Sequence, residues 1–184
     1  MTSEVVLRRN SWMVICWSII LGLGVGMVAA VFKVTSVNGF RVGWQGIPVY
    51  LAFVGIIGRV VSCKVILHRD TLIVVNPLRT HIIPAAVIHD VAVGDDGTLE
   101  VRLDNDRVVS VFAFGGSLID RFINSSEETA RKISGWLSST EEGRGLQKIA
   151  PEVRWTLCPS ADASLVLCIA LSATGAAWMA FTSN

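Results

Sequence analysis

Charged residues are scarce in this sequence, and the scarcity is uneven along the chain. Asp, Glu, Lys and Arg make up 17% of the 184 residues, whereas apolar residues make up 52%. A soluble domain usually carries about 25% charged residues. Almost all the deficit falls in three blocks, at 11–32, 46–63 and 161–181. This composition argues against an ordinary soluble domain as the whole of the protein.

Cysteine and histidine are too few and too widely spaced to indicate a bound metal. No C-x-x-C pair occurs, so neither a zinc site nor a disulfide framework is indicated. The histidine spacings of 13 and 8 residues match no metal motif. We interpret these residues as small apolar side chains and as ordinary strand or surface histidines: Cys16, Cys63, Cys158, Cys168, His68, His81 and His89.

Sequence signatures of catalysis are also missing. The chain has no G-x-S-x-G motif, phosphate-binding loop or catalytic Cys–His arrangement. Asp95 and Asp96 precede Gly97, which is typical of a turn rather than of an acid–base pair. The glycines at 22–26 lack the strand-then-helix context of a dinucleotide loop. We therefore predict a protein that is not an enzyme and that holds no cofactor or metal.

A strong net charge is absent as well. The formal charge of +1 predicts no nucleic-acid partner. Between Lys64 and Arg154, eleven Lys and Arg stand against thirteen Asp and Glu, a net charge of −2. That balance differs from the basic cluster that anionic lipid headgroups attract.

The first apolar block is long enough to cross a bilayer, which is therefore an expected partner. As a helix, residues 11–32 would span roughly 33 Å at 1.5 Å per residue. Arg8 and Arg9 precede the block, and Trp12 lies at its edge, as is typical of a membrane–water interface. A cleaved signal peptide is the alternative, but the apolar run exceeds the usual ~7–15 residues. We predict an uncleaved transmembrane helix.

The other two blocks predict two further transmembrane helices. Pro48 would fall in a first helical turn, where proline is tolerated. Arg59 lies near the end of its block, from which its side chain can reach the headgroups. A functional intramembrane Arg59 is the alternative, and we weigh against it because no acidic partner is expected in any apolar block. The third block is interrupted only by Asp162, at its start.

Small residues provide candidate packing faces. Gly22 and Gly26 form a G-x-x-x-G motif in the first helix, and the third block is rich in Ala, Ser, Thr and Gly. Small residues let helices approach closely. Gly22 and Gly26 are therefore candidate helix-packing residues, and a homo-oligomer is one way to use them.

Basic residues near the helix ends predict the orientation. Arg8 and Arg9 precede the first helix, and only Lys33 and Arg41 lie between the first two helices. More basic residues close the second helix, follow it or precede the third: Arg59, Lys64, Arg69, Arg79 and Arg154. By the positive-inside rule, the N-terminus and the middle of the chain lie in the cytoplasm of a plasma-membrane protein.

Between the second and third blocks, apolar residues alternate with polar ones. Leu99, Val101 and Leu103 alternate with charged residues, which predicts a strand with one solvent-facing side. Turn-forming residues bracket this strand at 95–97 and 105–106. Six short antiparallel strands are predicted in all: 65–68, 71–75, 79–83, 90–93, 99–103 and 107–114.

One amphipathic helix follows the predicted strands. Ser125 and Glu128 form a capping box. Ala130, Ile133 and Leu137 recur at helical spacing. We expect this apolar stripe to cover the sheet, which gives the middle of the chain an α+β fold.

A family pattern lies in the same region. It reads Thr71-Leu72-Ile73-Val74-Val75-Asn76, then Arg79, Ile82-Ile83-Pro84, Ile88 and Val91. It resembles the bacterial PH-like domain of the low molecular weight protein antigen 6 family, whose members often carry two transmembrane helices before the domain. This chain differs at Ala85, where the family has tryptophan, at Thr71, where it has glycine, and in its third helix. The resemblance covers about residues 60–137 and implies a small PH-like antiparallel β-barrel or sheet with a C-terminal helix.

Together these signals divide the chain into eight parts. We expect a cytoplasmic tail 1–10, a transmembrane helix 11–32, an extracytoplasmic loop 33–45, a transmembrane helix 46–63, a PH-like domain 64–139, a linker 140–160, a transmembrane helix 161–181 and a tail 182–184.

Three functions are compatible with this organisation. The first is a non-catalytic adaptor whose PH-like domain binds a protein partner at the cytoplasmic face. The second is a lipid-responsive module, in which Arg69, Arg79 and Arg107 gather at one rim as headgroup or partner contacts. The third is a small oligomeric transporter or channel component. We favour the adaptor because catalytic motifs are missing and the basic cluster is weak.

Overall fold

The computed structural model describes residues 4–104, 106–115, 125–141 and 150–182. The chain divides into two compact units. One, here called the β domain, comprises Met1–Arg9 and Ser62–Thr156, and the other, the helical bundle, comprises Asn10–Val61 and Leu157–Asn184.

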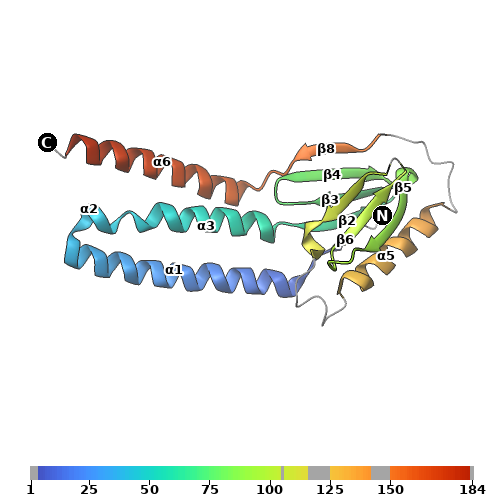
Figure 1. Cartoon of the computed structure of the whole chain (residues 1–184), viewed down its shortest axis with the longest axis horizontal. Helices are drawn as coiled ribbons and strands as arrows, with labels where there is room; N and C mark the ends of the chain where they lie inside the picture. The colour runs from blue at the N-terminus through green and yellow to red at the C-terminus, as the bar shows by residue number, and fades with distance from the viewer. Residues whose placement is uncertain (1–3, 105, 116–124, 142–149, 183–184) are drawn as a thin grey trace. The chain divides into compact units, whose positions relative to one another are not determined.

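The helical bundle contains α1 (Asn10–Asn38), the short α2 (Phe40–Gly43), α3 (Gly46–Val61) and α6 (Pro159–Phe181). Within this unit α3 packs against both α1 and α6 and runs between them (Figure 1). Three segments are long and apolar enough to cross a membrane: Trp12–Asn38, Phe40–Val61 and Pro159–Phe181. The chain is therefore a membrane protein by the length and composition of its helices.

The predicted end of the first helix and the predicted loop at 33–45 are wrong. The helix continues to Asn38, because the charge on Lys33 ends an apolar run without interrupting helical hydrogen bonding. The chain breaks at Gly39, whose φ of 77° lies in the left-handed region that favours glycine. Most of the remaining segment forms α2 rather than an irregular loop.

The β domain contains two antiparallel sheets. The five-stranded sheet has the order β1-β2-β3-β4-β8, and the three-stranded sheet has the order β5-β6-β7. The strands of the two sheets are β1 (Val5–Leu7), β2 (Lys64–His68), β3 (Thr71–Val75), β4 (Arg79–Pro84), β5 (Ile88–Val93), β6 (Leu99–Leu103), β7 (Val108–Val111) and β8 (Glu152–Trp155). The described residues of the domain also form two 3-10 turns, η1 (Ala85–Val87) and η2 (Phe112–Phe114), and the helix α5 (Ser125–Glu141). The predicted α+β class is confirmed at this level.

All six predicted strands are present as β2 to β7, with one notable change in length. The strand expected at 107–114 ends at Val111, and η2 takes its last residues. The predicted turns carry the expected backbone: Gly97 has a φ of 82° and Asp106 a φ of 57°.

Two strands fall where the sequence predicted a tail and a linker, and both predictions are wrong there. Val5–Leu7 pairs with β2, so part of the expected tail 1–10 is an edge strand. Glu152–Trp155 pairs with β4 inside the expected linker 140–160. Both strands are too short to show a periodic pattern, and each is held by a partner distant in the sequence.

The core of the β domain lies between the two sheets and α5. Its largest side chains with almost no exposed surface are Val65, Leu72, Val74, Ile83, Leu99, Val101, Val111 and Ile133. Ala130 and Ile133 of α5 are buried there, with Trp136 and Leu137 packed at the margin. The predicted apolar stripe of this helix is thus confirmed, whereas the side chain of Ser125, needed for the predicted capping box, lies outside the described residues.

The pairing of β1 with β2 constrains the path of the chain through a bilayer. Leu7 is the register partner of Val65, and hydrogen-bonded strands cannot be separated by hydrocarbon. The chain between them must therefore cross a bilayer an even number of times, as a hairpin of two spans does.

Candidate interaction surface

The structure does not bring the three predicted contact arginines together. Arg69 lies in the turn between β2 and β3, with a φ of 22°. Arg79 is the first residue of β4, at the other end of β3. The five residues of β3 separate these two ends by roughly 17 Å at about 3.4 Å per residue. Arg69 and Arg79 therefore cannot share one rim.

Arg107 lies at the same end of the domain as Arg69. Both of the turns that carry them are hydrogen-bonded to η1. The Ala85 N–H donates to the Asp70 carbonyl at 2.8 Å, and the Asp104 N–H donates to the Val87 carbonyl at 3.1 Å. Aspartates accompany both arginines in these turns, at positions 70, 104 and 106. This end of the domain is therefore mixed in charge rather than basic.

The outward side of the five-stranded sheet carries a continuous apolar row. Cross-strand register aligns four side chains, here called the outer row: Val6, Ile66, Ile73 and Ile82. Val6 is 50% exposed and the three isoleucines are partly exposed, whereas both strand neighbours of Ile66 and of Ile73, and Ile83 beside Ile82, are buried. At about 4.8 Å between strands, the row spans about 14 Å. It offers a flat surface of β-branched side chains.

Polar residues border the outer row. On one flank Lys64, Thr80 and Arg154 share its face. Beyond Ile82, Arg154 Nε contacts Glu152 Oε1 at 2.7 Å, and this hydrogen bond holds the pKa of Glu152 below its ordinary value. In the described part of the chain α5 packs against β5, β6 and η1, not against this face. An apolar centre with a charged rim is typical of an interaction surface.

The strand β8 adds an open edge beside this row. It ends the five-stranded sheet, and all four of its side chains are exposed. An edge strand presents N–H and C=O groups to which another strand can bind. Within the described residues, β4 is the one strand paired with β8.

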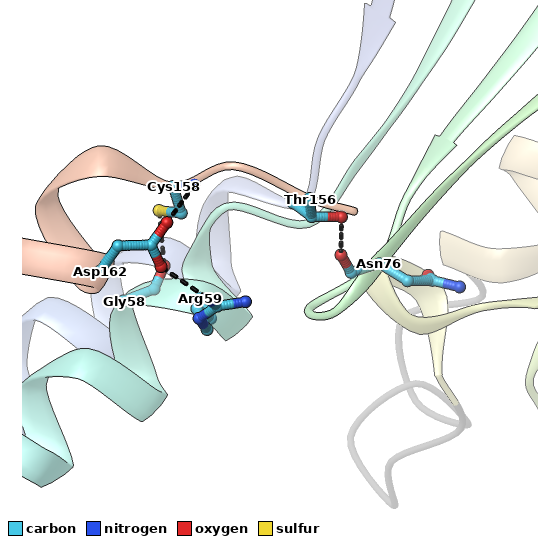
Figure 2. Close-up of polar contacts among 6 residues, drawn as sticks. All are labelled: Gly58, Arg59, Asn76, Thr156, Cys158 and Asp162. Carbon is cyan, nitrogen blue, oxygen red and sulfur yellow. Dashed lines mark hydrogen bonds and ion pairs between the residues drawn. The ribbon is translucent and has the colours of Figure 1, made fainter. Parts of the chain in front are cut away.

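Asn76 blocks the corresponding edge at the end of β7. Its Nδ2 donates to the Ser110 carbonyl and its Oδ1 accepts the Phe112 N–H, both at 2.9 Å. Its own carbonyl accepts a hydrogen bond from Thr156 Oγ1 at 2.8 Å (Figure 2). Sequence reasoning placed Asn76 only in a turn and in a family pattern, and missed that it joins the two sheets to the segment after β8.

The helical bundle contains one polar contact that the sequence analysis judged absent. Arg59 Nη2 lies 2.6 Å from Asp162 Oδ1, and Asp162 Oδ2 accepts the Cys158 N–H at 3.2 Å (Figure 2). The expectation that Arg59 has no acidic partner is therefore wrong. Arg59 lies in the last turn of α3 and Asp162 in the first turn of α6, where each charge is favoured by its own helix dipole.

The bundle packs on glycines other than the predicted pair. A Cβ atom at Gly22 or Gly26 would have nothing within 4 Å in the described structure. A Cβ at Gly55 would instead lie 2.5 Å from Leu165 Cγ, and one at Gly175 would collide with Trp44. These contacts with α6 thus require glycine, and within the part of the chain that the structure describes no contact is made at Gly22 or Gly26.

The histidines remain dispersed. Among the described residues, no group of three His, Cys, Asp or Glu side chains is placed to hold a metal ion. His68 and His89 are exposed, and His81 is partly buried in β4. Burial lowers the pKa of His81 below its ordinary value of 6.5, and the nearby charge of Arg79 lowers it further.

Comparisons with protein-family models, curated proteins and solved structures found no match to this chain. The family resemblance seen in the sequence therefore stays a prediction. The function has to be argued from the surfaces described above.

Proposed function

We propose that this protein is a non-catalytic membrane adaptor whose β domain binds a protein partner on the outer row and the β8 edge. The outer row is the observation that carries the proposal. Aliphatic side chains left partly open to solvent in cross-strand register are usually covered by another molecule. The open β8 edge would let a partner strand extend the same sheet.

We also propose a PH-like fold for the β domain. Two antiparallel sheets followed by one core-packed helix are compatible with it. The segment that carries the family pattern forms β3, β4 and β5, and its Asn76 is the residue that links the sheets. The added strands β1 and β8 would be features of this chain.

The proposed location of the β domain is the cytoplasmic side of the plasma membrane. Support comes from the basic residues beside the helix ends nearest the domain along the chain, Arg8, Arg9 and Lys64, against Lys33 and Arg41 in the hairpin. Because β1 pairs with β2, the N-terminal segment and the domain share one side.

A lipid-responsive role has less support than the adaptor role. Arg69 and Arg107 do lie at one end of the domain, but the same turns carry Asp70, Asp104 and Asp106. Anionic headgroups favour a basic cluster. The separation of Arg79 from this end removes the third member of the predicted set.

The test uses the full chain, since a fragment that starts at Lys64 and ends at Thr140 would lack β1 and β8. A photo-crosslinking amino acid is placed in cells at Ile73, in the outer row, or at Val108, on the other sheet, as the matched control. We expect a protein adduct at position 73 that is absent at position 108 and lost when Ile82→Lys is added. Equal adducts at both positions, or adducts to lipid alone, would overturn the proposal.

A further inference from the structure

An apolar groove lies in the helical bundle, on a surface that the proposed function does not use. Its volume is about 280 Å³. Its lining comes from one face of α3 and from two positions one turn apart on α6: Pro48, Val49, Ala52, Phe53, Ile56, Cys168 and Ser172.

Close contacts fix α6 against α3 alongside the groove. Ser164 Oγ of α6 donates to the Leu51 carbonyl of α3 at 2.9 Å, and Gly55 of α3 meets Leu165. Before the start of α3, the Trp44 ring lies against Gly175 of α6. These contacts set the spacing of the two helices beside the groove.

The chemistry of the groove restricts what can fill it. Val49, Phe53 and Ile56 at its margin are all more than half exposed in the isolated chain. All three lie on a segment apolar enough to cross a membrane, where the surroundings are hydrocarbon. The occupant must therefore be apolar along its whole length.

From this fit we infer that the groove holds one acyl chain of a bilayer lipid. A methylene group occupies about the ~30 Å³ of a liquid water molecule, so the groove accommodates roughly nine of them. The lining residues of α3 cover about 12 Å of helix, and a second helix of that length would occupy on the order of 900 Å³. A helix of another copy could not enter the groove whole and would reach it only with its side chains.

The experiment places the full chain in vesicles of a phosphatidylcholine with a diazirine in the middle of one acyl chain. After irradiation, adducts are mapped by mass spectrometry. We expect groove residues to be labelled at least fivefold more than Val25 and Phe32 of α1, which are even more exposed. Ala52→Phe should remove this excess by filling the groove, whereas Ala29→Phe on α1 should leave it unchanged.

Two results would overturn the inference. Equal labelling of the groove and α1 would mean boundary lipid only. Cross-links between copies through Cys168, with no excess of lipid adducts, would identify a second copy as the occupant. A thermal unfolding curve confirms that each variant is folded. Neither result bears on the outer row, so this test and the adaptor test fail independently.

Discussion

The β domain and the helical bundle are held together by different means. The domain buries large aliphatic side chains such as Leu72, Ile83 and Leu99 almost completely. In the bundle, only 11%, 17% and 0% of the most apolar windows of the three spans are buried. Its close contacts instead involve glycines and a few polar groups, such as the Arg59–Asp162 pair.

The difference follows from the solvent of each unit. In water, an aliphatic side chain gains about 25 cal/mol per Å² by leaving the solvent. In hydrocarbon that gain is absent, so helices associate through close packing and hydrogen bonds. The two units should therefore be sensitive to different substitutions: the β domain to the loss of a buried aliphatic side chain, and the bundle to a bulkier residue at a close contact or to the loss of a polar contact.

The largest effect is expected from truncating a core residue of the β domain. Leu72→Ala should lower the free energy of unfolding by about 2–5 kcal/mol, because it removes a fully buried side chain and leaves a cavity. Ile73→Ala, its neighbour in the outer row, should cost less than about 1.5 kcal/mol. Hydrogen exchange of the β3 and β6 amides in the full chain measures the free energy of unfolding of the domain in both variants. Equal costs would show that the outer row is part of a core.

The next largest effect is expected from weakening the Arg59–Asp162 ion pair of the helical bundle. Asp162→Asn weakens the ion pair with Arg59 and should cost about 1.5–3 kcal/mol, typical of a charged hydrogen bond. The first turn of α6 would then open more often, and maleimide labelling of the buried Cys158 should accelerate at least tenfold. Ser160→Ala, in the same turn, is the control. Unchanged labelling would mean that the pair does not hold α3 to α6.

Glycine substitutions test whether close packing supports the bundle. Gly55→Ala should lower stability by about 1–3 kcal/mol, because the added methyl group meets Leu165 and the Ala161 carbonyl. Gly22→Ala should be neutral or should stabilise α1 by up to about 1 kcal/mol, since alanine favours helix. Thermal unfolding in detergent compares them. If Gly22→Ala were the more damaging, that face would be packed in an oligomer.

The smallest effect is a pH dependence confined to the β domain. Well above pH 6.5, His81 is neutral in both folded and unfolded chains. As the pH falls below 6.5, the unfolded chain binds the proton first because the folded pKa is lowered, so the free energy of unfolding decreases until folded His81 also protonates. His81→Gln should flatten this part of the stability profile, and His89→Gln should not. The reverse result would place the titration elsewhere.

Sequence patterns predicted the helices and strands whose signal lies in residues close together along the chain. Alternation located β2 to β7, and helical spacing located Ile133 in the core, because both record which side of an element avoids water. The apolar blocks located the three long helices for a similar reason. The first of these blocks ended six residues before α1 does, since hydropathy marks contact with lipid and not helix ends.

What the sequence could not predict depends on pairings between distant segments. β1 has three residues and finds its partner some sixty positions later, so no local signal marks it. The Arg59–Asp162 pair joins residues 103 apart, although Asp162 was the one acid in any apolar block and could have been matched to Arg59. Asn76 looked like a turn residue because its side-chain partners lie more than thirty positions away.

The strand order also governs when the domain can be completed as the chain is synthesised. β1 leaves the ribosome first but waits for β2 until the hairpin of α1 and α3 has been made. β8 emerges last, so β4 keeps a bare edge through some seventy further residues. Nascent chains usually fold from the N-terminus onward. This one must keep an early strand available on the correct side throughout membrane insertion, and a stall before residue 152 would leave a domain with one strand missing.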